Sequence, residues 1–317
     1  MDAQHVPVLV EETLALLDPR RGGLFVDATL GLGGHAEAIL RASDSTRLVG
    51  IDRDPKALEL AARRLAPFDP AGDRVRCVNA NFHDLASALA GLGIFGGVSG
   101  ILADLGVSSM QLDTPERGFS FRFDAPLDMR MGLAERTAAD LVNHGSEGEL
   151  EKIIRDYGEE RQARRIARAI VDARQEEPIE TTGQLKRLID RVKGNRPRWD
   201  EGRREARIDP ATRVFQALRI AVNEELAGLE GFLQQAIDLL ETDGRMVIIS
   251  YHSLEDRIVK NTLRDNARGE IDLVTGRPHA ETQLIEALTR KPVRPGDAEV
   301  ARNPRSRSAR LRAARRI

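Results

Sequence analysis

Short apolar runs that end in acidic residues, with helical stretches between them, constrain the first hundred residues more than any other feature. The runs at 24–27, 48–51 and 100–103 end at or just before Asp27, Asp52 and Asp104, and a further apolar run lies at 74–78. Strands that alternate with helices predict an α/β fold with a doubly wound parallel sheet. Such sheets bind ligands at the carboxyl ends of their strands, where the three aspartates fall.

The next convincing strand, at 246–249, comes about 140 residues after Asp104, which is far more than a crossover between neighbouring strands needs. Helical periodicity at 153–174 and 182–192 occupies part of this interval. We therefore predict an inserted helical subdomain.

The predicted boundaries follow from these patterns. A helix that begins at Thr212 places Phe215, Leu218 and Val222 on one face, and we assign it to the main domain. The prediction is a main domain of residues 1–108 and 212–317 and an insert of residues 109–211.

The composition narrows the class of protein. The single cysteine, Cys77, cannot form an internal disulfide, and its apolar-alternating surroundings predict a buried strand thiol. Cysteine and histidine do not cluster at metal-ligand spacing, so we expect no metal site. Residues 1–17 do not resemble a signal peptide, and the chain has no run of 18 apolar residues. We expect a cytoplasmic protein that does not contact a membrane.

Positive charge is concentrated in two places although the net charge is only −2. Nine basic and four acidic residues lie between Lys186 and Arg207, and the last 17 residues contain seven arginines and no acid. Clustered positive charge can follow a phosphate backbone. A solvated surface and a frayed tail explain either cluster equally well. Only 12 residues are aromatic, which argues against broad stacking platforms for single-stranded nucleic acid.

A glycine-rich turn follows the first strand. Gly31, Gly33 and Ala36 match the pattern G-x-G-x-x-A, and Asp52 follows at the end of the second strand. The pattern leaves two cofactors open, a nicotinamide dinucleotide and S-adenosyl-L-methionine. Asp27 favours the second, because a pyrophosphate would meet its negative charge while a sulfonium would be attracted. Alternatively, the Asp27 carboxylate braces the loop.

Longer motifs resemble one family, the bacterial small-subunit ribosomal RNA cytosine-N4 methyltransferases. The resemblance runs in order through nearly the whole chain. It includes Asp27-Ala-Thr-Leu-Gly-Leu-Gly-Gly-His35, Gly50-Ile-Asp-Arg-Asp-Pro55, Asp104-Leu-Gly-Val-Ser-Ser109, Arg117-Gly-Phe-Ser-Phe-Arg122, His252-Ser-Leu-Glu-Asp-Arg257 and Asn303-Pro-Arg-Ser-Arg-Ser308.

The resemblance implies a Rossmann-like class I methyltransferase domain interrupted by a helical RNA domain. It implies S-adenosyl-L-methionine as cofactor and N4 of a cytidine in the decoding region of 16S ribosomal RNA as target, within a small subunit or an assembly intermediate. The implied cofactor contacts are Gly33, Gly34, His35, Asp52, Phe82, Asp104 and Gln111. Asp209 and Tyr251 depart from the family pattern, which has histidine and phenylalanine there.

The chemistry requires a group that accepts a hydrogen bond from the weakly nucleophilic N4 amine. Asp104 is the best-placed candidate, although it could serve the cofactor instead. His252 is a second catalytic candidate, and bracing of the strand-end loop is an equal alternative. Arg117, Arg122 and Arg130 either bind phosphate or fold the insert. A nicotinamide-dependent oxidoreductase and a non-catalytic ribosome-assembly factor remain as alternative functions.

Overall fold

The computed structural model describes residues 7–106, 114–132, 134–194, 209–270 and 279–317. The chain divides into two compact units. The first contains residues 1–106 and 226–317, and the second contains residues 107–225. Within the described ranges, no helix is both long enough and apolar enough to span a membrane.

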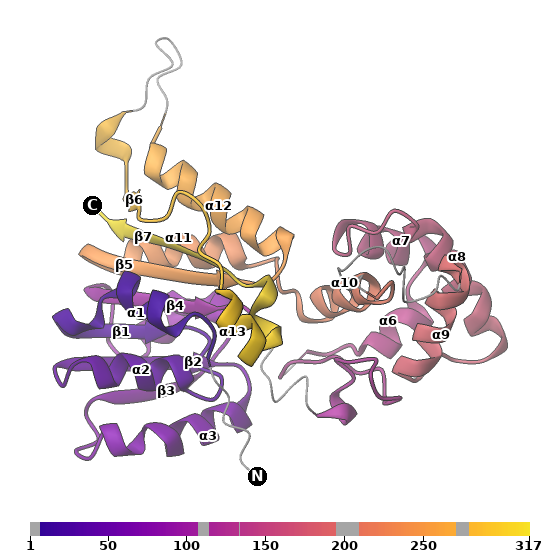
Figure 1. Ribbon diagram of the computed structural model, residues 1–317, viewed down its shortest axis with the longest axis horizontal. Coiled ribbons are helices and arrows are strands. Elements are labelled where there is room, and N and C mark those ends of the chain that lie inside the picture. Colours follow the sequence, from indigo (N-terminus) through magenta and orange to yellow (C-terminus); the bar gives the residue numbers. More distant parts are fainter. Residues whose placement is uncertain (1–6, 107–113, 133, 195–208, 271–278) are drawn as a thin grey trace. The chain divides into compact units, whose positions relative to one another are not determined.

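A mixed sheet forms the centre of the first unit (Figure 1). Among the described residues its strand order is β3-β2-β1-β4-β5-β7-β6. The first five strands are parallel, and β7 runs antiparallel to both β5 and β6. The bounds are Gly23–Asp27 (β1), Thr46–Asp52 (β2), Val75–Asn79 (β3), Val98–Asp104 (β4), Leu240–Ser250 (β5), Ile285–Ala287 (β6) and Arg310–Arg316 (β7). The predicted doubly wound parallel sheet is confirmed, with an antiparallel pair added at one edge.

Helices cover both faces of this sheet because successive strand residues point to opposite sides. Phe25 and Leu48 pack with the helices of one face, whereas their neighbours Val26 and Val49 pack with those of the other. The first face carries α1 (Val10–Leu17), α2 (Gly34–Ala42) and α3 (Pro55–Leu65), and the second carries α4 (Leu85–Ala90), α11 (Leu229–Leu239) and α12 (Ser253–Arg268). Short elements complete the unit: η1 (Pro19–Arg21), η2 (Ala66–Phe68), η3 (Phe82–Asp84), η5 (Ala280–Thr282), α13 (Asp297–Arg302) and η6 (Pro304–Ser308).

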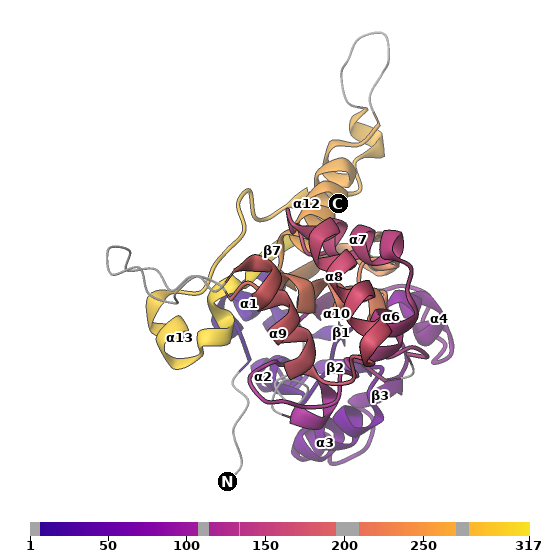
Figure 2. The same cartoon turned by 90° about the vertical axis from the view of Figure 1, so that its right-hand side faces the viewer.

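The second unit is helical, as predicted. It contains η4 (Pro115–Arg117), α6 (Ala138–His144), α7 (Glu147–Asp156), α8 (Ala163–Glu176), α9 (Thr182–Lys193) and α10 (Thr212–Asn223). Helix α7 lies against α8, and α8 lies against α9 (Figures 1 and 2). The single periodic stretch predicted at 153–174 is therefore two helices, which are separated by the turn at 157–162.

The predicted boundary after residue 211 is wrong for helix α10. Val214, Phe215 and Leu218 are buried in the core of the second unit, and the Phe215 ring meets that of Phe121 edge-on at 4.9 Å. The residues predicted to share one face of α10 are indeed apolar and are buried or partly buried, but amphipathicity alone does not say which core a helix joins. The second unit therefore extends to Glu225.

Two further expectations are corrected in the first unit. Cys77 is exposed, because β3 is the edge strand of the sheet and only β2 pairs with it. The arginine-rich end of the chain is not a frayed tail, since residues 310–316 form β7 inside the sheet. Arg312 is only 7% exposed because Asp256 of α12 pairs with its guanidinium, with 2.7 Å between Nε and Oδ1.

Candidate active site

Three carboxylates lie at one edge of the sheet, at the carboxyl ends of neighbouring strands. Strand β1 pairs with β2 on one side and β4 on the other, so the direction of winding reverses between β1 and β4. Ligands of open α/β sheets bind at this switch point. Asp27 ends β1, Asp52 ends β2 and Asp104 ends β4. The sheet thus brings together the acidic residues that the sequence places up to 77 positions apart (104 − 27).

The glycine loop between β1 and α2 is held in place by Asp52. The backbone amide of Gly31 donates to Asp52 Oδ2 at 2.8 Å, and the amide of Asp54 donates to Oδ1 at 2.8 Å. Gly31 and Gly33 have φ angles of 52° and 76°, a region that side-chain-bearing residues rarely adopt. Burial raises the pKa of Asp52, and the two amide hydrogen bonds oppose this shift. Each carboxylate oxygen retains a second lone pair for a ligand.

Asp27 is the most buried of the three carboxylates, with 1% exposure. Burial raises its pKa to about 7, and the negative charges of Asp104 and Asp52 add to this shift. The Thr29 amide opposes it by donating to Oδ1 at 3.2 Å. The bond from the Thr29 amide braces the loop, and a positive ligand near Asp27 would favour the ionised form of its carboxyl group.

Asp104 is oriented by groups from three segments. Its backbone amide donates to Thr29 Oγ1 at 2.6 Å, and its Oδ2 lies 3.9 Å from His35 Nδ1. The Tyr251 hydroxyl forms a hydrogen bond with its carboxylate. Burial, followed by the charge of Asp104, raises the pKa of Tyr251 well above its usual value. Gly106 is required beside this pair, because a Cβ there would lie 2.5 Å from Tyr251 Cε2.

The remaining predicted cofactor residues surround the loop. His35 is buried, and its Nε2 donates to the Val8 carbonyl at 2.8 Å. A Cβ on Gly34 would lie 3.0 Å from Pro7 Cγ, so glycine allows the N-terminal segment to approach α2. Phe82 is partly buried in η3, where its ring meets that of Phe232 edge-on at 5.1 Å. Gln111 lies outside the described residues.

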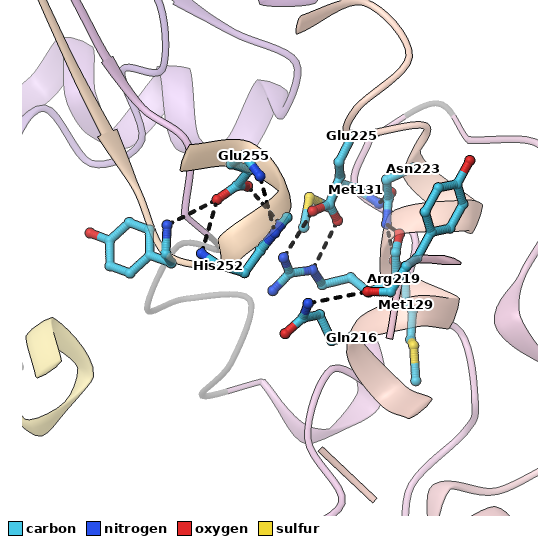
Figure 3. Close-up of polar contacts among 10 residues, drawn as sticks. Met129, Met131, Gln216, Arg219, Asn223, Glu225, His252 and Glu255 are labelled. Carbon is cyan, nitrogen blue, oxygen red and sulfur yellow. Dashed lines mark hydrogen bonds and ion pairs between the residues drawn. The ribbon is translucent and has the colours of Figure 1, made fainter. Parts of the chain in front are cut away.

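His252 has a structural task at the start of α12 (Figure 3). It is the N-cap, and its Nδ1 accepts from the Glu255 amide at 3.4 Å. Glu255 Oε2 in turn accepts from the His252 amide at 3.4 Å, which completes a capping box, and it also accepts from the Tyr251 amide at 2.9 Å. These contacts brace the loop that follows β5, as the alternative interpretation of His252 expects. Asp256 braces the same helix through Arg310 and Arg312 of β7.

The second unit has its own buried polar network, also drawn in Figure 3. Asn223, which is 5% exposed, donates to the Met129 carbonyl at 2.8 Å and accepts from the Met131 amide at 2.7 Å. These bonds hold Met129 at a φ of 62°. Arg219 and Glu225 form a two-pronged ion pair at 2.8 and 2.9 Å. The sequence does not predict the role of Asn223, because its hydrogen-bond partners lie about 90 residues earlier in the chain (223 − 131 = 92).

Several basic side chains of the second unit are engaged in its own folding. Lys193 pairs with the buried Glu160 at 2.5 Å, and Lys186 pairs with Asp190 at 2.6 Å. Arg130, a phosphate candidate, instead forms a two-pronged pair with Asp128 at 2.8 Å. Lys186 also lies 3.3 Å from Asp209, so the departure from histidine at this position adds an ion pair.

A cavity of about 370 Å³ in the second unit is lined by His144, Arg174 and Glu180, among other residues. The Arg174 guanidinium donates to the carbonyls of Val142 and Gly145 at 2.7 Å, so it caps the end of α6. Two of the five N–H donors of Arg174 are therefore used to hold the end of α6.

The strand order and the carboxylates at the switch point define the class: this is a Rossmann-like, class I methyltransferase fold with an inserted helical unit. The chain belongs to the MraW methylase family, whose model matches residues 2–317.

Curated relatives are similar to this chain over their full length. The chain is 52% identical to the ribosomal RNA small subunit methyltransferase H of Geotalea uraniireducens, covering 100% of this chain and 99% of that protein. It is 54% identical to the protein of the same name from Geobacter sulfurreducens, covering 100% of both. A crystal structure of a putative rRNA methylase from Clostridium thermocellum is 12% identical, with a TM-score of 0.43 over 97% of this chain and 95% of that chain.

Proposed function

We propose that this protein methylates N4 of a cytidine in the decoding region of 16S ribosomal RNA. S-adenosyl-L-methionine, when bound, supplies the methyl group as an electrophile on a positive sulfur. The observation that carries the proposal is the set of three buried or partly buried carboxylates around a glycine loop. The names of the full-length relatives support ribosomal RNA of the small subunit as the substrate.

The charge of the site favours a cationic cofactor. A pyrophosphate at the glycine loop would lie near the carboxylates at the ends of β1 and β4, Asp27 and Asp104, and would be repelled by their negative charge. A cofactor that carries an ammonium and a sulfonium gains from the same charges. The nicotinamide alternative is therefore disfavoured on electrostatic grounds.

Each predicted residue has a task that its position allows. Asp52 accepts from the ribose hydroxyls while it holds the Gly31 amide, and Phe82 offers an apolar surface to the adenine. Gly33, Gly34 and His35 lie at the start of α2, where the glycine loop ends, and are proposed to contact the cofactor there. Gln111 is proposed for the methionine end together with Asp104.

Asp104 is proposed as the acceptor for the N4 amine. The nitrogen lone pair of cytosine N4 is delocalised into the ring, so attack on the methyl group requires a pyramidal nitrogen. A carboxylate that accepts an N4–H bond stabilises this geometry and the positive charge that develops. Thr29 and Tyr251 hold the Asp104 backbone and carboxylate in place for this contact. The transfer would form the carbon–nitrogen bond and break the carbon–sulfur bond of the bound cofactor, and the surplus N4 proton would pass to the Asp104 carboxylate that accepts its hydrogen bond.

The first test replaces Asp104 with asparagine. If Asp104 accepts from N4, the variant should lower the single-turnover methylation rate by about 10²-fold or more, with a far smaller change in cofactor affinity. Asp52→Asn is the matched comparison, because loss of a cofactor ligand should be rescued at saturating cofactor. Full rescue of Asp104→Asn at saturation would show that Asp104 is a cofactor ligand instead.

The second test separates the enzyme from a non-catalytic assembly factor. The protein is incubated with labelled S-adenosyl-L-methionine and small-subunit particles, and the modified nucleoside is mapped. We expect label on N4 of one cytidine. Absence of label from free 16S RNA, assembly intermediates and mature particles alike would refute the proposed function.

A further inference from the structure

Exposed arginines lie just before β7, at the sheet edge that carries the candidate active site. Strand β7 is antiparallel to β5, and its first residue, Arg310, pairs with the last residue of β5, Ser250. The residues that precede β7 therefore lie at the carboxyl edge of the parallel strands. This segment comprises α13 and η6, and it exposes Arg302, Arg305 and Arg307, which we call the arginine rim. Figure 1 shows α13 in gold beside this end of the sheet.

Two contacts connect α13 to the candidate site. Glu299 Oε1 accepts from the Leu9 amide at 2.8 Å, and the adjacent residue Val8 accepts from His35. The charge of Glu299 also acts on Tyr251, the partner of Asp104. The arginine rim is therefore close to the proposed reaction centre.

The backbone of η6 is anchored so that its arginines face outward. Ser306 is fully buried, and its hydroxyl donates to the Asn303 carbonyl at 2.8 Å. Asn303 caps η6 by accepting from the Arg305 amide at 3.3 Å. Arg305 and Arg307 flank the buried serine and are both exposed. A preformed backbone lowers the entropy lost when a ligand binds to these side chains.

The acidic residues of α13 do not pair with Arg302 or Arg307. Glu299 faces inward to the Leu9 amide, and Asp297 lies in the first turn, at the opposite end of α13 from Arg302. Over the ranges that the structure describes, Arg302 and Arg307 form no ion pair with a carboxylate. The next arginines in the chain differ, because Arg310 and Arg312 both pair with Asp256.

We propose that the arginine rim binds backbone phosphates of the substrate RNA next to the target nucleotide. This inference rests on the proposed function. A planar guanidinium offers paired N–H donors that match two phosphate oxygens, and such charge-assisted bonds position RNA without reading its sequence. The arginine-rich end of the chain thus has two halves: residues 302–307 hold RNA, and residues 310–316 hold the sheet together.

The test compares two triple variants of the full-length protein. The rim variant is Arg302→Gln/Arg305→Gln/Arg307→Gln. The control is Arg20→Gln/Arg47→Gln/Arg268→Gln, which removes equal charge from exposed arginines. Arg20 precedes β1, Arg47 is near the start of β2, and Arg268 ends α12, so all three lie toward the amino edge of the sheet. Methylation of small-subunit particles, binding of 16S RNA at several salt concentrations and cofactor affinity are measured.

We expect the rim variant to raise KM for the RNA roughly 10-fold or more and to reduce the slope of log affinity against log salt by about 2, since each phosphate contact contributes about 0.7–0.9. Its kcat at saturating RNA and its cofactor affinity should stay within about twofold of wild type, as expected for contacts outside the reaction centre. The control should change neither KM nor the salt slope.

An unchanged salt slope in the rim variant, or an equal change in the control, would overturn the proposal. If the proposed function is wrong, the wild-type protein itself will not methylate the RNA, and this outcome differs from any effect of the rim variant. The salt dependence of RNA binding would still test the rim in that case.

Discussion

Three aspartates at the same sheet edge have different surroundings, which assign them different tasks. Asp52 holds two backbone amides, Asp27 holds one in a fully buried position, and Asp104 meets the Tyr251 hydroxyl. Identical side chains thus differ in the groups that bind them and in the hydrogen bonds that they can offer to a ligand.

Asp52→Ala should weaken S-adenosyl-L-methionine binding by roughly 1.5–3 kcal/mol, the range for loss of a hydrogen bond to a charged group. Two causes act together, because the variant loses the ribose contact and releases the Gly31 amide of the loop. Isothermal titration calorimetry measures the effect. Asp44→Ala is the control, since Asp44 is a fully exposed carboxylate before β2. Equal affinities of Asp52→Ala and wild type would contradict the assignment.

Asp27 should make the unliganded protein less stable as the pH rises. Its pKa is about 7 in the folded state against 3.8 as the ordinary value, so the folded state binds more protons between these values. The free energy of unfolding must therefore fall as the pH rises from about 4 to about 7, by up to roughly 4 kcal/mol, and stay low above that range.

Asp27→Asn removes the titrating group and should flatten this part of the pH dependence. Urea unfolding of both proteins at pH 5 and pH 8 measures the difference. The variant should lose less stability than wild type between the two pH values, and parallel losses would show that Asp27 stays ionised in the folded protein.

At the scale of elements, β7 shows how arginines are accommodated inside a sheet. Both faces of β7 are covered between Leu311 and Ala314, and Arg312 is buried only because Asp256 of α12 binds its guanidinium. The pair connects α12 to the sheet. It also leaves a buried charge if either partner is removed.

Asp256→Ala should lower the free energy of unfolding by about 3–5 kcal/mol, because the guanidinium of Arg312 would remain buried without its carboxylate. The double variant Asp256→Leu/Arg312→Met removes both charges and should recover most of this loss. Denaturant unfolding of the wild type and both variants measures the effect. If the double variant is less stable than Asp256→Ala, the ion pair adds to the free energy of unfolding beyond offsetting the cost of burying its two charges.

At the scale of the whole molecule, helix α10 decides where the two units separate. Its apolar residues are buried in the helical unit, and Asn223 at its end holds the chain at Met129 and Met131. An insert that ended at residue 211 would therefore separate α10 from the core residues of the second unit that it packs against. A cut at the boundaries 106 and 225 leaves each core intact.

A protein in which a short glycine–serine linker replaces residues 107–225 should fold and bind S-adenosyl-L-methionine through Asp52 and the glycine loop, although loss of Gln111 should weaken the binding. It should lose RNA methylation if the insert holds RNA, as we propose. The comparison protein lacks only residues 109–211, so it exposes Val214, Phe215 and Leu218 and should aggregate or lose stability. Calorimetry, size-exclusion chromatography and a methylation assay check these outcomes. Retained RNA methylation by the first protein would refute the role of the insert.

The sequence alone determined the features that depend on local pattern. Short apolar runs predicted β1 to β5, and the glycine-rich turn after the first of them predicted the cofactor loop. Because parallel strands end at a common edge, the aspartates at the ends of β1, β2 and β4 could be grouped before the structure was known. The long interval between β4 and β5 likewise predicted a helical insert.

Only the tertiary structure decided the features that depend on distant partners. Strand β7 contains arginines that look solvent-exposed until Asp256 is placed beside them, and Cys77 looks buried until β3 is found at the sheet edge. The assignment of α10 to the second unit and the capping role of His252 have the same cause. Burial and pairing are properties of contacts between remote segments, whereas hydrophobic period and turn chemistry are written into neighbouring residues.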